Sequence, residues 1–182
     1  TEHGVYFCHR GLYNPTIHVP MLVHWPGTVP EGVRVTPLVS GVDVFPTVLE
    51  LMGIDTADMD IDGSSLVPSF TAPEAPIHEV IFAETVQGAG RAVMQGEDKF
   101  LKQYGADPFI SGNHLFRTFE DYGEQTDQLL SRPERADELE ELLERWYGSN
   151  KVRQLDSKER VNLDRETAEA LKALGYADQI EE

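Results

Sequence analysis

The alternation of apolar and polar positions predicts one strand and one helix in the first third of the chain. Residues 19–25 (VPMLVHW) form a short apolar run that ends at a Pro-Gly turn, which is typical of a buried strand. Residues 43–52 carry apolar side chains at helical spacing, with Ser40 and Asp43 as capping residues and Gly53 as the stop. The helix face that we expect to be buried consists of Val42, Phe45, Val48, Leu49 and Met52.

A small antiparallel sheet is predicted further along the chain. Residues 79–84 alternate with period two, and residues 91–104 contain two strands around a turn at 96–98. Residues 114–121 form one more short strand. Neighbouring strands that are joined by tight turns pair in antiparallel order, so these segments predict one sheet.

Two amphipathic helices are predicted in the last third of the chain. Residues 131–147 begin with a capping box formed by Ser131 and Glu134. The apolar face of this helix consists of Ala136, Leu139, Leu142, Leu143 and Trp146. Residues 148–162 are polar, and a last helix is expected over about 164–174.

The order of these elements indicates an α/β fold that passes into an α+β fold. We expect residues 1–76 to be the C-terminal part of an α/β domain and residues 77–147 to be a small α+β subdomain. Residues 148–182 are then a polar linker followed by a helix. A parallel sheet needs several strand-helix units and only one or two are present, so the pattern is that of the second half of a larger domain.

Composition excludes several classes of partner. The chain has 182 residues and a formal net charge of −17, from 32 acidic and 15 basic residues. An acidic surface repels nucleic acid and anionic membranes, so neither is an expected partner. Abundant acidic residues with scarce lysine favour a halophilic protein, with an ordinary acidic enzyme as the alternative. The single cysteine, Cys8, allows no internal disulfide; the compartment stays open, with the cytoplasm preferred.

The first residues carry a resemblance to a known family. EHG at 2–4, HRGLY at 9–13 and TIHVPMLVHWPG at 16–27 together resemble the sulfatase family of the alkaline phosphatase superfamily. Residues 38–54 are similar to the family's helix with a Val-Asp and a Pro-Thr pair. DGSSLVP at 62–68 is similar to the family's Asp-Gly-x-Ser-Leu-x-Pro loop.

Three later segments continue the resemblance in the same order. GRAVMQGEDKFLKQYG, EDYGEQTDQLL with the helix after it, and ALKALGY each resemble the corresponding sulfatase segment. The resemblance implies an alkaline-phosphatase-like α/β sandwich followed by a small sheet and helix. It also implies a sulfuric ester hydrolase that cleaves sulfate monoesters, small molecules or sulfated glycans, with formylglycine and a calcium ion.

The family's nucleophile and metal ligands are not assigned to this chain. Cys8 begins Cys-His-Arg-Gly-Leu, which lacks the Pro and the Arg of the family's Cys- or Ser-x-Pro-x-Arg motif. We interpret residues 2–4 as the second His-Gly of the family's string, which lies after the last metal ligand. The formylglycine and the calcium ligands are therefore expected upstream, and residues 1–182 alone are expected to be inactive and to require that missing part.

Three residues are candidates for the sulfate site by this resemblance. Sulfate-ester cleavage develops negative charge that cationic side chains stabilise, and the leaving oxygen needs a proton. His9 lies ten residues before Val19, where the family has Lys or Arg, and is expected to be a donor or general acid. Arg10 is the alternative cationic contact, and His3 is expected to order the loop behind the metal. The other interpretation places His9 and Arg10 on a solvated turn.

The remaining histidines and charged residues are expected to have structural roles. His18 is expected to support the opening loop, and His24, His78 and His114 are expected to be paired core or edge histidines. Asp43 is interpreted as a helix cap. Arg91 and Lys99 are expected at the surface, with an approach to the cleft on the hairpin as the alternative. Asp60 and Asp62 give only an incomplete calcium-loop pattern.

Two other functions stay open at this point. A phosphodiesterase or phosphonate-ester hydrolase of the same superfamily would share the fold and some of these residues. A non-catalytic remnant, or a partner subunit that completes another polypeptide, would share the fold without the activity.

Overall fold

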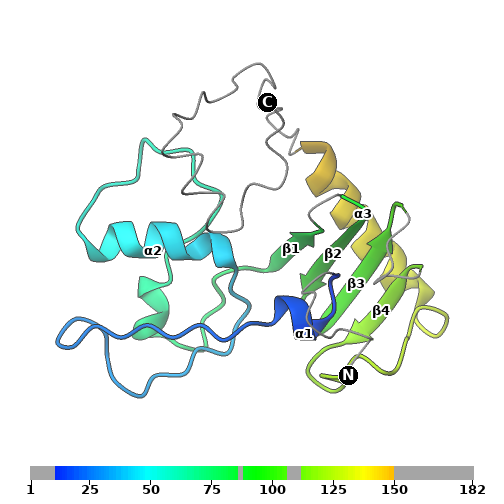
Figure 1. Ribbon diagram of the computed structural model, residues 1–182, viewed down its shortest axis with the longest axis horizontal. Helices are drawn as coiled ribbons and strands as arrows, with labels where there is room; N and C mark the ends of the chain where they lie inside the picture. The colour runs from blue at the N-terminus through cyan, green and yellow to red at the C-terminus, as the bar shows by residue number, and fades with distance from the viewer. Residues whose placement is uncertain (1–10, 86–87, 106–111, 150–182) are drawn as a thin grey trace, which may run out of the picture. The chain divides into compact units, whose positions relative to one another are not determined.

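The computed structural model describes residues 11–85, 88–105 and 112–149. The chain divides into two units, residues 1–149 and residues 150–182, and only the first contains described residues. Figure 1 shows its elements. The helical ones are α1 (Asn14–Ile17), η2 (Gly41–Asp43), α2 (Val44–Leu51), η3 (Val67–Phe70) and α3 (Pro133–Ser149). The strands are β1 (Val80–Glu84), β2 (Gly90–Gln95), β3 (Asp98–Gln103) and β4 (His114–Arg117).

The predicted antiparallel sheet is confirmed. Its strands lie in the order β1-β2-β3-β4, and each neighbouring pair is antiparallel. Val93 lies opposite Phe100, which in turn lies opposite Leu115, so apolar side chains share one face across three strands. Gly96 has φ 61° in the tight turn between β2 and β3, a conformation that favours glycine.

One face of the sheet packs against α3 (Figure 1). The buried residues of this core are Val93, Phe100, Leu115, Ala136, Leu139 and Leu143. Phe82 on β1 and Trp146 on α3 stack with ring centroids 4.6 Å apart. The predicted apolar face of this helix is therefore confirmed.

The start of α3 differs from the prediction. The helix begins at Pro133, and the Ser131 hydroxyl donates to the carbonyl of Gln128 instead of capping the helix. Proline suits the first helical position because its missing N–H would have no intrahelical acceptor there. The predicted capping box of Ser131 and Glu134 is wrong because a local turn before the helix uses that hydroxyl.

The other face of the sheet is covered by residues 12–13, near the start of the described chain. Leu12 and Tyr13, just before α1, are buried against Ala92, Leu101 and Phe116. The sheet therefore has a hydrophobic layer on both faces, one supplied by α3 and one by residues close to the N-terminal end of the described chain.

The predicted helix over 43–52 is confirmed as α2, but its buried face is not the predicted one. The buried residues are Asp43, Pro46 and Thr47, whereas Phe45 is 58% exposed and Met52 is 63% exposed. The reason is that the loop before η3 packs against the polar side of the helix start. The described part of the chain places nothing over the apolar side.

Residues 62–66 pack closely against this helix start. The amides of Ser64 and Leu66 donate to the Asp43 carboxylate and the Thr47 hydroxyl, at 2.9 Å each. A Cβ on Gly63 would lie 2.2 Å from the carbonyl oxygen of Val42. Only glycine fits at that position, which explains the Gly in the DGSSLVP loop.

The predicted strand over 19–25 is wrong for the described structure. This segment contains no strand, and Leu22 is 90% exposed. A buried strand needs neighbouring strands to accept its backbone hydrogen bonds, and the described residues supply none beside it. The expected α/β sandwich portion is therefore not seen among the described residues, whereas the small sheet with its helix is.

Two further expectations, on the last helix and on the domain boundary, are not decided by the described residues. The predicted helix over 164–174 lies outside the described residues, and the domain boundary at 76/77 stays a prediction. Among the described residues, no helix is both long and apolar enough to cross a membrane.

Candidate functional site

The three candidate catalytic residues, His3, His9 and Arg10, lie outside the described residues. The described chain begins at Gly11, directly after Arg10. The structure therefore describes how the residues that follow the candidate site are held, and not the site itself.

The segment that follows the candidate site is anchored in the sheet. Gly11, Leu12 and Tyr13 are buried, and Gly11 has φ 95°, which favours glycine. The Tyr13 ring lies 6.1 Å from that of Phe116 and 6.4 Å from that of His114 on β4, measured between centroids. Burial and the nearby Glu124 carboxylate raise the pKa of the Tyr13 phenol, so this side chain stays neutral near neutral pH.

A buried polar cluster continues this anchor at Asn14, the first residue of α1. The backbone N–H of Asn14 donates to Glu124 Oε2 at 2.7 Å, and its Nδ2 donates to the carbonyl of Tyr122 at 3.0 Å. Lys99 Nζ donates to Asn14 Oδ1 at 3.1 Å and forms an ion pair with Glu124 Oε1 at 2.5 Å. We call Asn14, Lys99 and Glu124 the anchor triad.

The anchor triad is buried from solvent. The side chains of Lys99 and Glu124 are 0% exposed, and Asn14 is 3% exposed. Burial lowers the pKa of Lys99, and the charge of Glu124 opposes that shift. The two charges are taken out of water together, which is tolerated only because they pair with each other and with Asn14.

Glu124 itself has an unusual backbone conformation. It is the one described non-glycine residue with positive φ, at 51°, and its N–H donates to the carbonyl of Asp121 at 2.9 Å. This left-handed conformation costs a non-glycine residue of the order of 1 kcal/mol. The turn that precedes Glu124 therefore directs its carboxylate inward at a cost in backbone strain.

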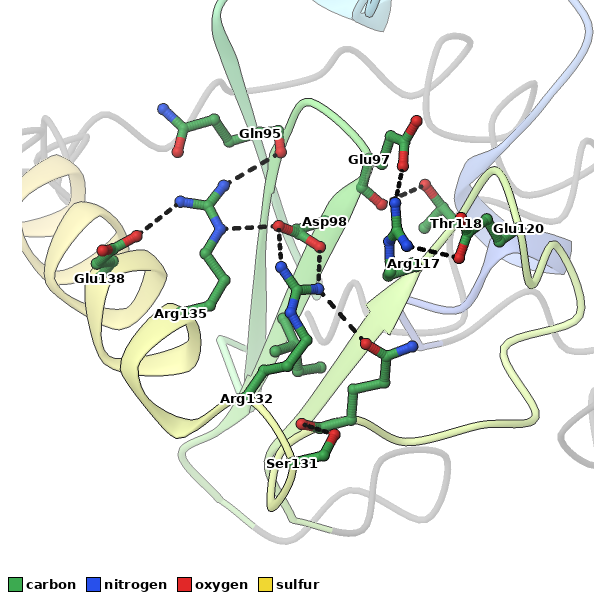
Figure 2. Close-up of polar contacts among 12 residues, drawn as sticks. Gln95, Glu97, Asp98, Arg117, Thr118, Glu120, Ser131, Arg132, Arg135 and Glu138 are labelled. Carbon is green, nitrogen blue, oxygen red and sulfur yellow. Dashed lines mark hydrogen bonds and ion pairs between the residues drawn. The ribbon is translucent and has the colours of Figure 1, made fainter.

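The opposite face of β3 carries a different ion cluster, shown in Figure 2. Asp98 accepts hydrogen bonds from Arg132 at 2.6 Å and from Arg135 at 2.8 Å, and Arg135 also pairs with Glu138. Burial raises the pKa of Asp98, but the two guanidinium groups outweigh it and hold the pKa below its usual value. This cluster joins the start of α3 to the turn between β2 and β3 and is partly exposed.

Two surface predictions are corrected here. Lys99 and Arg91 are both buried, and Arg91 lies with its guanidinium carbon 3.4 Å from the ring centroid of Tyr147 while its Nε donates to Glu84 at 3.0 Å. Strand periodicity alone would place Lys99 on the same face as Leu101, which is fully buried. That alternation is the signal that could have found the buried lysine.

The other histidines are mostly structural. His78 Nε2 lies 2.9 Å from both carboxylate oxygens of Asp43, and His114 Nδ1 lies 2.8 Å from Asp127 Oδ2. His18 has its ring 5.3 Å from that of Tyr122, whereas His24 is exposed. The expected pairing is thus confirmed for His78 and His114 and wrong for His24, whose predicted strand does not form.

The described residues show no metal site. Nowhere in residues 11–85, 88–105 and 112–149 do three or more His, Cys, Asp or Glu side chains form a group that could hold a metal ion. Asp60 and Asp62 are exposed, in keeping with their incomplete calcium-loop pattern.

Known proteins resemble this chain over part of its length. Residues 1–82 match the family described as N-sulphoglucosamine sulphohydrolase, C-terminal. Arylsulfatase D of Homo sapiens is 41% identical over 83 residues, which are 43% of this chain and 14% of that protein. The resemblance to the C-terminal region of sulfatases is confirmed. Arylsulfatase G of Mus musculus is 33% identical over 96 residues, 53% of this chain and 16% of that protein.

Solved structures share the fold of part of this chain. The crystal structure of Ps i-CgsB matches with a TM-score of 0.56 at 28% identity, over 68% of this chain and 27% of that chain. The structure of BT4656 in complex with D-glucosamine-2-N,6-O-disulfate matches with a TM-score of 0.56 at 19% identity and supports the fold. The chain thus spans about a seventh of the curated sulfatases and about a quarter of the solved structures that it matches.

Proposed function

We propose that this chain is the C-terminal part of a sulfatase-type hydrolase and that its opening segment lines the sulfate pocket. The observation that carries the proposal is the match of residues 1–82 to a sulfatase C-terminal family, because that match includes the opening segment. The exposed apolar residues of 19–25 and of α2 support it, since they would pack against the rest of an α/β domain.

His9 is proposed as the hydrogen-bond donor or general acid at the sulfate group. A neutral or cationic imidazole can donate to a sulfuryl oxygen, and a cationic one can protonate the leaving alkoxide. Arg10 is proposed as the second cationic contact, and His3 as a residue that orders the loop. The anchor triad follows these residues in the chain and would hold their segment at the edge of the sheet.

The described residues do not fit the calcium ion that the family implies, because they contain no suitable group of ligands. The calcium ligands and the formylglycine are therefore proposed to belong to residues outside this chain. When bound, such a cation would supply charge stabilisation for the sulfuryl oxygens.

The proposed substrates are sulfate monoesters, either small aryl esters or sulfated glycans. Support for glycans comes from two similar structures, Ps i-CgsB in complex with k-i-k-neocarrahexaose and BT4656 with a disulfated glucosamine. A panel of sulfated oligosaccharides, with the desulfated products identified by mass spectrometry, would assign the class.

The test compares the complete sulfatase containing this chain with residues 1–182 alone. The complete protein should release 4-nitrophenol from 4-nitrophenyl sulfate, and His9→Ala should reduce kcat about 100-fold. Glu141→Ala is the control, because Glu141 is exposed on α3, outside both the candidate site and the surface proposed to meet the rest of the domain. Residues 1–182 alone should show no hydrolysis, and measurable hydrolysis by them would contradict the proposal.

The same assay separates the other functions. Hydrolysis of bis(4-nitrophenyl) phosphate in preference to the sulfate ester would indicate a phosphodiesterase. Failure of the complete protein on both substrates would indicate a non-catalytic remnant or a partner subunit.

The halophile hypothesis also becomes a proposal. A net charge of −17 repels itself, and salt screens that repulsion. The thermal midpoint of the chain should therefore rise steadily from low to molar KCl, and a midpoint independent of salt would contradict halophily.

A further inference from the structure

We infer that Lys99 and Glu124 are positioning residues for the proposed sulfatase reaction and act through Asn14 on the segment that carries His9 and Arg10. This inference rests on the proposed function. Asn14 is 110 residues from Glu124 and 85 residues from Lys99 in the chain, yet the three side chains form one buried cluster.

Asn14 is restrained at three points, two of them within the anchor triad. Its backbone N–H, its side-chain N–H and its side-chain oxygen each have a partner, on Glu124, Tyr122 and Lys99 respectively. Both the backbone and the side chain of Asn14 are thus held against the sheet. Four residues span at most about 14 Å, so this restraint also limits where the segment just before Asn14 can reach.

The chemistry of the triad favours a positioning role over a purely stabilising one. Replacing a buried ion pair by apolar side chains of similar volume is often neutral or stabilising. On the α3 face of the same strand Phe100 fills the core, and the buried Asp98 pairs with two arginines that reach solvent, Arg132 and Arg135. On the opposite face a charged pair occupies the interior, where its directional hydrogen bonds fix Asn14 in one orientation.

The backbone of Glu124 gives a second, independent observation. Its φ of 51° is strained for a glutamate, and such strain concentrates where geometry is needed for function. Glycine would relieve the strain but would remove the carboxylate that holds the Asn14 amide.

The experiment uses the complete sulfatase containing this chain, with 4-nitrophenyl sulfate as the probe. Lys99→Met and Glu124→Gln should each lower kcat about 100-fold and change KM less than about threefold, because a displaced catalytic segment loses transition-state contacts. Asn14→Ala keeps the ion pair and should lower kcat about tenfold with little loss of folding.

A double variant and a control separate positioning from stability. Lys99→Met with Glu124→Leu should restore the thermal midpoint to the wild-type value or above it, while kcat stays about 100-fold low. Asp98→Asn on the α3 face of the same strand should lower the midpoint but leave kcat within about twofold of wild type.

The outcomes are distinguishable. If the double variant regains both stability and kcat, or if Lys99→Met behaves like Asp98→Asn, the positioning role is overturned and the proposed function stands. If the wild-type protein does not cleave sulfate esters, the proposed function fails and the inference fails with it. If single variants do not fold, Asn14→Ala and the double variant decide.

Discussion

Apolar side chains are buried in the four-stranded sheet but exposed in much of the region of residues 19–54. In the sheet, Val93, Leu101 and Leu115 are completely buried, whereas Leu22 and Phe45 in the other region lie mostly in solvent. Both regions have clear apolar patterns in the sequence. A pattern of apolar positions therefore identifies the face to be covered, but not whether the covering element belongs to the same chain.

The described residues thus complete the core between the sheet and α3. In contrast, α2 and residues 19–25 leave an apolar surface that the described residues do not cover. If the proposed function is right, that surface packs against the remaining part of the α/β domain. Five substitutions test this contrast.

The largest effect should come from the core beneath α3. Leu139→Ala removes a completely buried side chain from the sheet-helix interface and should cost about 3–5 kcal/mol in unfolding free energy. Urea denaturation followed by far-UV circular dichroism measures it.

The matched substitution in the other region is Phe45→Ala, which in residues 1–182 should change the unfolding free energy by about 0.5 kcal/mol or less. In the complete protein the same change should cost about 3 kcal/mol, if the proposed domain covers Phe45. Equal small effects in both proteins would refute the idea that α2 packs against the missing part.

A smaller loss is expected at the loop that covers the polar side of α2. Gly63→Ala places a methyl group against the Val42 carbonyl and should cost about 1–3 kcal/mol. Gly41→Ala is the control, because a Cβ there meets nothing within 4 Å. The two variants should differ clearly in thermal midpoint, and identical midpoints would mean that the loop does not pack as described.

The ion cluster at the α3 rim should make stability depend on acid pH. The folded pKa of Asp98 is lowered, so its contribution is present above the ordinary value of 3.8 and is lost as pH falls through the folded pKa. Asp98→Asn should cost about 2 kcal/mol at pH 7, because the three charge-assisted hydrogen bonds from Arg132 and Arg135 are weakened. The variant should also lose less stability than wild type on acidification, as measured by urea midpoints from pH 6 to pH 2; parallel pH curves would contradict this role.

The smallest effect is expected at the predicted helix cap. Ser131→Ala should change the unfolding free energy by about 0.5 kcal/mol or less, because the Ser131 hydroxyl bonds the exposed Gln128 carbonyl and not the start of α3. A loss above about 1 kcal/mol, typical of an N-cap, would show that the sequence prediction was right after all.

The local elements of this protein could be predicted from its sequence. Period-two alternation predicted β1, the turn at 96–98 predicted β2 and β3 around it, and a short segment from residue 114 predicted β4. Helical spacing predicted α2 and α3. These features depend on neighbours along the chain, so the sequence contains the information that determines them. The family resemblance rests on the same short segments.

Tertiary structure alone decided which faces are buried and which charges are paired. Lys99 became interior because residues 85 and 25 positions away, Asn14 and Glu124, supply its partners, and the apolar side of α2 stayed exposed because the described chain brings nothing to it. Burial and ion pairing depend on contacts between distant segments, and no local pattern encodes those contacts.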